Sequence, residues 1–267
     1  MLMNTEDKGL FADLANPVRL EILKILQTTS STQSKLSGSL DMTIQGLQRH
    51  IGLLLKSGLI RKDADGNLLL SSVGIAALEQ IPTFLFLSTH QNYFKDHDFS
   101  GIPKKLVQRL GDLYECEFID DTMETWQRGK EICENCEEYL VAVTFMQPIE
   151  FFDSVKIKLE KGVRFKLGFP ESRFVAKGYS QKRAEVGWND AIKNGQVEEF
   201  FVKNVPVTVL VTEKEALLLF SNTKTGQIDG SSAFYSKNKC FRRWGLDLFD
   251  YYYHEVERID TPPIQEV

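Results

Sequence analysis

Residues 14–63 read LANPVRLEILKILQTTSSTQSKLSGSLDMTIQGLQRHIGLLLKSGLIRKD, and this stretch predicts the fold of the N-terminal part of the chain. A short segment opening on serine and threonine separates two helical patterns. The second pattern, Met42–Ser57, places its apolar residues on one face: Ile44, Leu47, Ile51, Leu54 and Leu55. Gly58 follows as a helix stop, and the next residues alternate around Asp65-Gly66 as a hairpin. Helix, short helix, turn, helix and hairpin is the order of a winged helix-turn-helix.

The polar side of the second helical pattern has the chemistry of a DNA-reading surface. Glutamine can bridge an adenine edge, arginine can fork onto guanine and threonine can reach a base or its methyl group. Gly46 costs about 1 kcal/mol in a helix interior but would permit close approach to the duplex. Arg61 and Lys62 in the hairpin suit phosphate contact. The sequence therefore predicts double-stranded DNA as a partner, bound by Thr43, Gln45, Gly46, Gln48, Arg49, Arg61 and Lys62.

Two other interpretations of this surface stay open at the level of sequence. The same side chains could be ordinary solvated positions, and winged helices also serve as protein-docking modules. The net charge of −5 and the pI of about 5.5 suit docking and argue against a protein coated in nucleic acid. Phosphate attraction acts within roughly 10 Å, however, so a local basic surface is enough for DNA. Residues 35–62 carry five lysines and arginines against Asp41 alone.

Length and composition indicate an ordinary globular protein of two domains. The 267 residues exceed one helix-turn-helix, and the 42% hydrophobic and 26% charged residues are typical globular values. Four cysteines without a signal peptide indicate a reduced compartment, and no apolar run approaches the about 20 residues of a membrane span. We expect a cytoplasmic protein that contacts no membrane.

The chain divides into four predicted segments. Residues 1–93 are the winged helix-turn-helix domain with a long linker helix from Val73 to Tyr93, kinked at Pro82, which either pairs with its twin in a dimer or packs on its own second domain. Residues 94–103, rich in turn-forming residues, are a linker. Residues 104–260 are a regulatory α/β domain, and residues 261–267 are a tail.

The second domain is predicted to hold a mixed, partly parallel sheet. Two buried strands, residues 139–145 and 163–169, flank a helix over residues 148–161, which indicates a parallel pair with a right-handed crossover. Further strands are expected over residues 115–119, 197–202, 207–212 and 216–221, and a closing amphipathic helix over residues 244–258. The fold class is thus an α+β winged helix followed by an α/β domain.

Ligands of open sheets bind beyond the carboxyl ends of parallel strands. Polar and aromatic residues that follow these strands or lie in polar connections are the candidate ligand-binding residues: Thr144, Gln147, Arg173, Trp188, Asp229 and Ser231. Each has a plain structural alternative, since Trp188 could be a packing aromatic and Asp229 and Ser231 could cap the last helix. The ligand itself is not indicated by the residues.

Cys133 and Cys136 stand one helical turn apart, so a thiol switch or a shared metal is an alternative to a small organic effector. Structural zinc needs four ligands, and no second close pair is present in the sequence. Flanking glutamates would raise the thiol pKa and oppose reactivity. We therefore predict no metal and no cofactor.

Two groups of motifs carry a resemblance to known regulators. LANPVRLEILKIL followed by LQRHIGLLLKSGLI resembles the arsenical-resistance-type winged-helix repressors. HDFSGIPKKLVQRLGDLYECEFI, EYLVAVTFMQPIEFFDSVKIKLEKGVRFKLGF and QIDGSSAFYSKNKCFRRWGLDLFDYYYHEV resemble archaeal transcriptional regulators of the methanogenesis and filamentation regulator type. The resemblance covers about residues 10–258. It implies a homodimeric archaeal DNA-binding regulator whose sensor domain is similar to the effector region of sugar-sensing TrmB-like regulators, related to the phospholipase D fold.

The enzyme form of the phospholipase D fold needs a histidine followed two places later by lysine. None of the four histidines here is followed in that way: His50, His90, His97 and His254. No catalytic residue is therefore predicted, and we expect no enzyme activity. The expected function is sequence-specific regulation of transcription by a symmetric dimer, with a ligand in the second domain biasing the spacing of its two DNA-reading helices.

Overall fold

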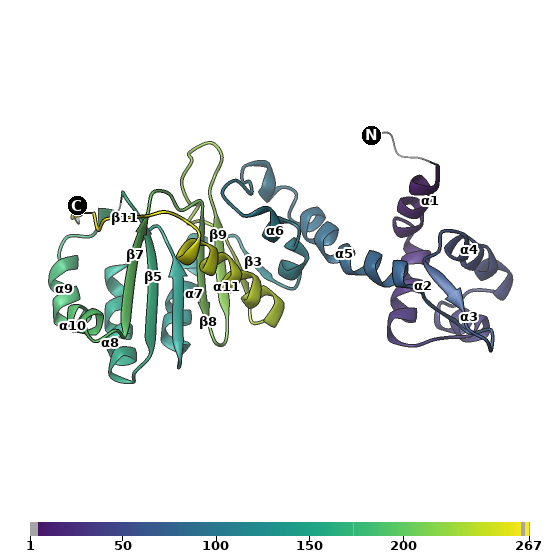
Figure 1. Cartoon of the computed structure of the whole chain (residues 1–267), viewed down its shortest axis with the longest axis horizontal. Coiled ribbons are helices and arrows are strands. Elements are labelled where there is room, and N and C mark those ends of the chain that lie inside the picture. Colours follow the sequence, from purple (N-terminus) through teal and green to yellow (C-terminus); the bar gives the residue numbers. More distant parts are fainter. Residues whose placement is uncertain (1–4, 173, 263–264, 267) are drawn as a thin grey trace. The chain divides into compact units, whose positions relative to one another are not determined.

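The computed structural model describes residues 5–172, 174–262 and 265–266. It consists of two compact units, Met1–Phe84 and Leu85–Val267, each with a hydrophobic core of its own (Figure 1). The boundary between them falls inside one helix, α5 (Ser72–Thr89).

The first unit has the element order predicted from the sequence. Its elements before α5 are α1 (Thr5–Leu14), α2 (Pro17–Thr28), α3 (Gln33–Ser39), α4 (Ile44–Lys56), β1 (Ile60–Lys62) and β2 (Leu68–Leu70). Asn16, Thr32 and Thr43 cap the second, third and fourth helices by accepting a backbone N–H with the side chain. Strands β1 and β2 pair antiparallel to form the predicted hairpin. Gly58 and Gly66 take positive φ angles of 72° and 82°, as the helix stop and the hairpin turn require.

A small core holds this unit together. It contains one apolar stripe from α2, one from α4, and residues of the hairpin: Ile22, Leu23, Leu26, Leu36, Leu47, Ile51, Leu54, Leu59, Ile60, Leu68, Leu70 and Leu78. One expectation was wrong. Ile44 belongs to no buried stripe, because it begins α4 beyond the core and is 47% exposed. The N-terminus also differs, because the quoted patterns begin at Leu14 whereas the structure has a further helix, α1, from Thr5.

The second unit is built on a mixed sheet, as predicted. Eight strands are present in the described residues, in the order β11 (Arg258–Ile259), β7 (Val197–Val202), β5 (Arg164–Pro170), β4 (Tyr139–Val143), β8 (Val207–Thr212), β9 (Ala216–Phe220), β10 (Ala233–Ser236) and β3 (Glu117–Ile119). Neighbours β4, β5 and β7 run parallel, and every other pair is antiparallel. The predicted parallel pair is confirmed.

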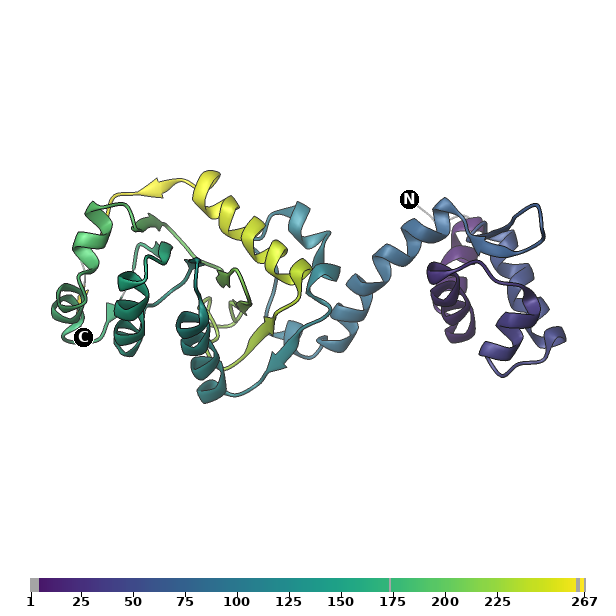
Figure 2. The same ribbon diagram turned by 90° about the horizontal axis from the view of Figure 1, so that it is seen from below.

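Helices cover both faces of this sheet, as Figure 2 shows. One face packs against α7 (Thr122–Asn135), α8 (Phe152–Glu160), α9 (Tyr179–Glu185) and α10 (Trp188–Lys193). The other packs against α6 (Lys104–Val107), the 3-10 helix η2 (Leu110–Leu113) and α11 (Lys239–His254). Strand β8 shows the alternation that this requires, since Val207, Val209 and Val211 are buried toward α11 while Leu210 points to the opposite core.

The segment predicted as a linker lies within the second unit. His97 and Ile102 are 6% and 8% exposed, and Phe94 and Phe99 pack on the core beside α11. The 3-10 helix η1 (Tyr93–Lys95) follows α5 in the same region. The predicted tail also differs, because β12 (Gln265–Glu266) pairs in parallel with β6 (Phe174–Val175). Apolar side chains between the turn-forming residues of 94–103 explain the first difference, since they provide enough area to anchor the segment.

Candidate functional site

The turn between α3 and α4 fixes the helix that the sequence predicts to read DNA. Asp41 takes a φ of +49°, and the Met42 N–H donates to the Ser37 carbonyl at 3.0 Å. The Thr43 hydroxyl then accepts from the Gly46 N–H at 3.1 Å and closes the first turn of α4. A Cβ on residue 46 would lie 3.2 Å from that hydroxyl oxygen, so glycine leaves room for the cap as well as for any approaching partner.

All seven residues predicted to contact DNA are exposed in the first unit: Thr43, Gln45, Gly46, Gln48, Arg49, Arg61 and Lys62. Beneath them, Leu47, Ile51 and Leu54 are buried on the opposite side of α4. The helix therefore presents a polar face outward over an apolar back, as a groove-reading helix must. Ile44 adds an apolar side chain to this outward face, which the sequence reading did not foresee.

Five cations of the first unit are exposed and form no ion pair with any described residue: Lys35, Arg49, Lys56, Arg61 and Lys62. Arg19 behaves differently, because it is paired with Asp13 at 2.9 Å. The hairpin has two carboxylates: Asp65 is exposed, and Asp63 accepts from the Asn67 side chain and backbone. These bonds, with a smaller contribution from Arg61, lower the pKa of Asp63. The α3, α4 and hairpin region therefore carries uncompensated positive charge.

His50 lies on α4 behind this surface. Burial lowers the pKa of His50, and the positive charges of Arg19 and Arg49 lower it further. The imidazole is thus neutral at pH 7 and contributes no charge to a nucleic-acid interface.

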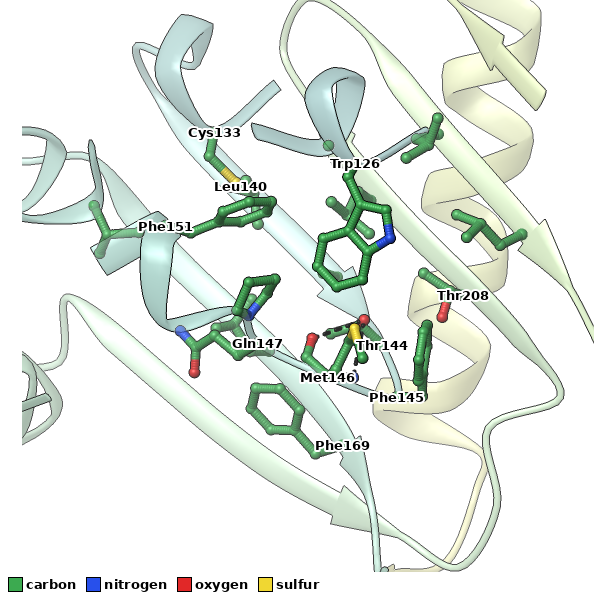
Figure 3. Close-up of a pocket in the computed structure, with 18 of the residues that line it drawn as sticks. Trp126, Cys133, Leu140, Thr144, Phe145, Met146, Gln147, Phe151, Phe169 and Thr208 are labelled. Atoms are coloured by element: carbon green, nitrogen blue, oxygen red, sulfur yellow. Dashed lines mark hydrogen bonds between the residues drawn. The ribbon is translucent and has the colours of Figure 1, made fainter. Parts of the chain in front are cut away.

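A cavity in the second unit is the second candidate site. It lies between the sheet and α7, over β4 and β5 and reaching their carboxyl ends, and it holds about 790 Å³ of empty space, counting the part open to solvent (Figure 3). The 3-10 helix η3 (Ile149–Phe151) closes one side. Figure 3 shows Trp126 of α7 and Phe151 of η3 across from one another, with Met146 and Phe169 on the side of the strand ends.

The structure places the predicted ligand-binding residues in three groups. Thr144 and Gln147, which follow β4, line the cavity, and so does Trp188, which the sequence placed in a polar connection. Asp229 and Ser231 do not line it, although their neighbour Gly230 does. Arg173 lies outside the described residues.

Asp229 instead connects two segments of the motifs quoted above, the HDFSGIP segment that begins at His97 and the QIDGSS segment that begins at Gln227. Its Oδ2 lies 3.0 Å from Nε2 of His97, and its Oδ1 accepts from the Ser231 backbone and hydroxyl. His97 also stacks on Tyr93 with ring centroids 3.8 Å apart. Burial raises the pKa of Asp229, but the bonds from Ser231 and His97 outweigh burial and hold it below its usual value. Residues 97–103 and 228–232 thus form a clamp, because these contacts hold the segment predicted as a linker against the β9–β10 connection.

Trp188 is a fixed wall of the cavity and no lid. It is fully buried, and its Nε1 donates to Glu199 Oε1 at 3.0 Å. Glu199 also receives two bonds from the Arg183 guanidinium, at 2.9 and 2.6 Å. Burial opposes the charge of Arg183, but the bonds and charge of Glu199 raise the pKa of the guanidinium above its ordinary value. This buried pair supports the cavity from behind.

The sequence did not predict that α7 lines the cavity. Thr125, Gly129 and Cys133 recur every fourth residue and form a stripe of small side chains that faces the cavity, with Trp126 at its edge. That spacing is visible in the sequence, but the surrounding charged residues made the helix look polar throughout. Thr208 of β8 was missed because it lies within a run of valines.

The two neighbouring cysteines are unsuited to reactivity. Cys133 and Cys136 are both buried, and Cys136 Sγ donates to the Cys133 carbonyl at 3.2 Å. Burial raises the pKa of both thiols, that of Cys136 to about 11. Both are therefore protonated at pH 7. Among the described residues, no three or more His, Cys, Asp or Glu side chains are grouped so that they could hold a metal ion.

No protein-family model matches the chain, and no curated protein sequence is significantly similar to it. Among solved structures, TrmBL2, an archaeal chromatin protein described as showing a novel mode of DNA binding, is 12% identical with a TM-score of 0.39, covering 97% of this chain and 95% of that one. An ArsR family transcriptional regulator is 27% identical with a TM-score of 0.26, over 34% of this chain and 97% of that one. Nuc from Salmonella typhimurium, a phospholipase D family member, is 11% identical with a TM-score of 0.36, over 51% and 91%. At these TM-scores the function has to follow from the residues of this chain.

Proposed function

We propose that this chain is a sequence-specific double-stranded DNA-binding regulator of transcription, acting as a homodimer and responding to a small molecule bound in its second unit. The observation that carries the proposal is the outward face of α4. Polar base-reading side chains lie over a buried apolar stripe, and unpaired cations flank them on α3, α4 and the hairpin.

Specificity and affinity are assigned to different side chains. Gln48 and Arg49 can form two hydrogen bonds each with a base edge, so they would carry sequence preference. Arg61 and Lys62 in the hairpin would contact phosphates and hold the register. Ile44, exposed beside them, suits contact with a thymine methyl group.

The dimer is supported by apolar residues of the first unit that nothing in the described chain covers. Phe11 of α1 and Val73, Ile75 and Phe84 of α5 are each at least half exposed. A monomer gains nothing from the exposed halves of these four side chains, whereas burying each against a second copy would contribute about 1 kcal/mol. Sedimentation of the full chain tests this: a dimer is expected, and Ile75→Glu should shift it toward monomer.

The ligand response is supported by the cavity beneath α7. It reaches the strand ends, where ligands of open sheets bind, and its walls are apolar and aromatic, as in most small-molecule sites. A ligand there would act by binding more tightly to one of two arrangements of the dimer.

The experiment begins with a random duplex library, from which the full chain selects fragments that are then sequenced. A recurrent, two-fold symmetric motif is expected. The Gln48→Ala and Arg49→Ala variants should lose preference at defined positions, by about 1–3 kcal/mol for each base contact. Selection without any enriched motif would contradict sequence-specific binding.

A protein-docking function is the second candidate, and the exposure of Ile44 and Leu53 on α4 favours it. The two functions differ in their salt dependence. DNA binding weakens steeply with salt because counterions are released, whereas docking through apolar side chains does not.

A further inference from the structure

We propose that the cavity beneath α7 takes a neutral, largely apolar small molecule with one or two hydrogen-bonding groups, and not a sugar, a phosphate or a carboxylate. This inference rests on the proposed function only in assigning that molecule the role of effector. The binding site itself follows from the residues that line the cavity.

The walls of the cavity are apolar and aromatic. Trp126, Met146, Phe151 and Phe169 surround the space that Figure 3 shows, and Leu140, Ala142 and Leu217 of the sheet line its floor. No charged side chain of a described residue lines it. Against the described residues, an anionic ligand would therefore lose its hydration without gaining a cation in return, which is strongly unfavourable.

The N-terminus of α7, whose free N–H groups could otherwise bind an anion, does not take the place of a cation. The first turn of α7 is capped by its own residue, because Asp121 Oδ1 accepts from the Glu124 N–H at 2.8 Å. A phosphate at that end would face the Asp121 carboxylate. The apolar lining and the occupied helix end together exclude the usual ways of binding an anion.

Two hydroxyls in the lining indicate that the ligand carries a polar group. Thr125 on α7 and Thr208 on β8 are 4% and 2% exposed, and neither hydroxyl has a hydrogen-bond partner among the described residues. Buried polar groups in folded proteins are nearly always paired. Both oxygens are closed to water, so a ligand with a hydroxyl, carbonyl or N–H group would reach them only after the hydroxyls rotate toward the cavity.

The same polar groups are too few for a sugar. Thr144 already donates to the Met146 carbonyl at 3.0 Å, and Gln147 Oε1 already accepts from Tyr179 at 2.5 Å. A monosaccharide carries several hydroxyls, most of which would face aromatic and aliphatic walls. The lining therefore disagrees with the sugar effectors that the resemblance to TrmB-like regulators would imply.

The test uses two probes that differ by one charged group. N-phenyl-1-naphthylamine is neutral, apolar and carries one N–H, and 1-anilinonaphthalene-8-sulfonate is the same molecule with a sulfonate added. The full chain is titrated with each probe, and energy transfer from Trp126 and Trp188 in the lining reports binding. We expect the neutral probe to bind at least tenfold more tightly than the sulfonate, and glucose or maltose at millimolar concentration not to displace it.

Variants locate the probe in the cavity. A Cβ atom on residue 129 would fit without a clash, because its nearest neighbour, the Phe151 ring, would lie 3.8 Å away. Gly129→Leu therefore fills the cavity from α7 and should abolish binding of the neutral probe. Gln127→Leu adds the same side chain at an exposed position of the same helix and should leave binding unchanged.

Thr208→Val tests the hydroxyl. Without a ligand the change removes an unpartnered buried polar atom at constant shape, so the melting temperature should stay equal or rise. Affinity for the neutral probe should fall about two- to tenfold if its N–H donates to this hydroxyl. A clear drop in melting temperature would mean that the hydroxyl is already satisfied within the protein, against the inference.

The outcomes separate this inference from the proposed function. Equal binding of both probes, or binding that Gly129→Leu does not alter, overturns the ligand class whatever the DNA result. Tight binding of the neutral probe that Gly129→Leu abolishes supports it, even if the duplex library yields no motif. DNA affinity measured with and without the neutral probe then tests the effector role separately.

Discussion

Replacing Arg61 with alanine should change the salt dependence of DNA binding by a defined amount. Arg61 lies in β1, is exposed, and forms no ion pair with any described residue. Its removal should leave the fold unchanged, since an exposed side chain at such a position contributes within about 0.5 kcal/mol to stability. The effect on binding can therefore be attributed to the lost charge.

The magnitude follows from the number of unpaired cations. Each phosphate neutralised on duplex DNA contributes about −0.9 to the slope of log affinity against log salt. If all five cations of the first unit contact phosphates, the slope is about −9 for a dimer, and Arg61→Ala reduces it to about −7.2. Between 50 and 200 mM salt, the wild-type affinity should fall roughly 10⁵-fold and the variant's roughly 10⁴-fold.

Fluorescence anisotropy with a labelled duplex of the selected motif measures this slope over a salt series. Lys24→Ala is the matched control, because Lys24 is exposed on α2 with Glu21 at 3.9 Å and so carries little net field. The reasoning is refuted if Arg61→Ala leaves the slope unchanged, or if Lys24→Ala lowers it equally. Circular dichroism melts of both variants exclude unfolding as the cause.

Three further perturbations test the framework that holds both sites. Gly74→Ala would bring a Cβ to 2.0 Å from the Leu59 carbonyl oxygen, so the first unit should lose at least about 3 kcal/mol of unfolding free energy, or fail to fold, in circular dichroism melts. Glu199→Gln strands the buried Arg183 charge and should cost the second unit about 3–5 kcal/mol, measured in urea through the tryptophans, all of which lie in that unit; a loss below about 1 kcal/mol would contradict a buried pair. The pKa of Asp229 is lowered in the folded protein, so the ionised carboxylate stabilises the fold above its unfolded pKa of about 3.9, and this stabilisation is lost as the pH falls through the folded pKa. Asp229→Asn should therefore flatten the curve of unfolding free energy against pH in that acidic range. An unchanged curve would contradict a stabilising contact between Asp229 and His97.

The first unit could be predicted closely because its signals are local. Helix caps at Asn16, Thr32 and Thr43, the glycines after α4 and in the hairpin, and the apolar stripe of α4 each act within a few residues. Such patterns specify structure before any long-range packing is known. The burial of Ile44 was predicted wrongly, because local patterns do not show whether the core extends far enough to cover an apolar residue at the end of a helix.

The second unit was less predictable because its site depends on contacts between distant residues. The parallel pair of β4 and β5 follows from local patterns, so the strand-end residues Thr144 and Gln147 were found. Thr208 reaches the same cavity only because β8 enters the sheet beside β4. Asp229 was misjudged for the opposite reason, since its partner His97 stands 132 positions away in a segment that looked like a linker.

The exposed apolar residues of α5 could be covered either by a membrane or by a second copy of the chain. By length and composition alone, Ser72–Thr89 could cross a bilayer, and 17% of it is buried, although the sequence reading found no apolar run of that length. The helix is about 27 Å long, which approaches the hydrocarbon thickness of about 30 Å.

Both ends of α5 are packed into protein cores, however. Leu78 is 6% exposed in the core of the first unit, and Phe86 is fully buried in the core of the second. Insertion would strip both residues from their cores and place the Glu79 charge and Pro82 at the bilayer centre, where an acidic group alone costs about 2.5–3.5 kcal/mol. Val73 and Phe84 are eleven residues apart and so lie on the same side of α5, and both are exposed. A second copy could cover them without disturbing either core, as the proposed dimer requires.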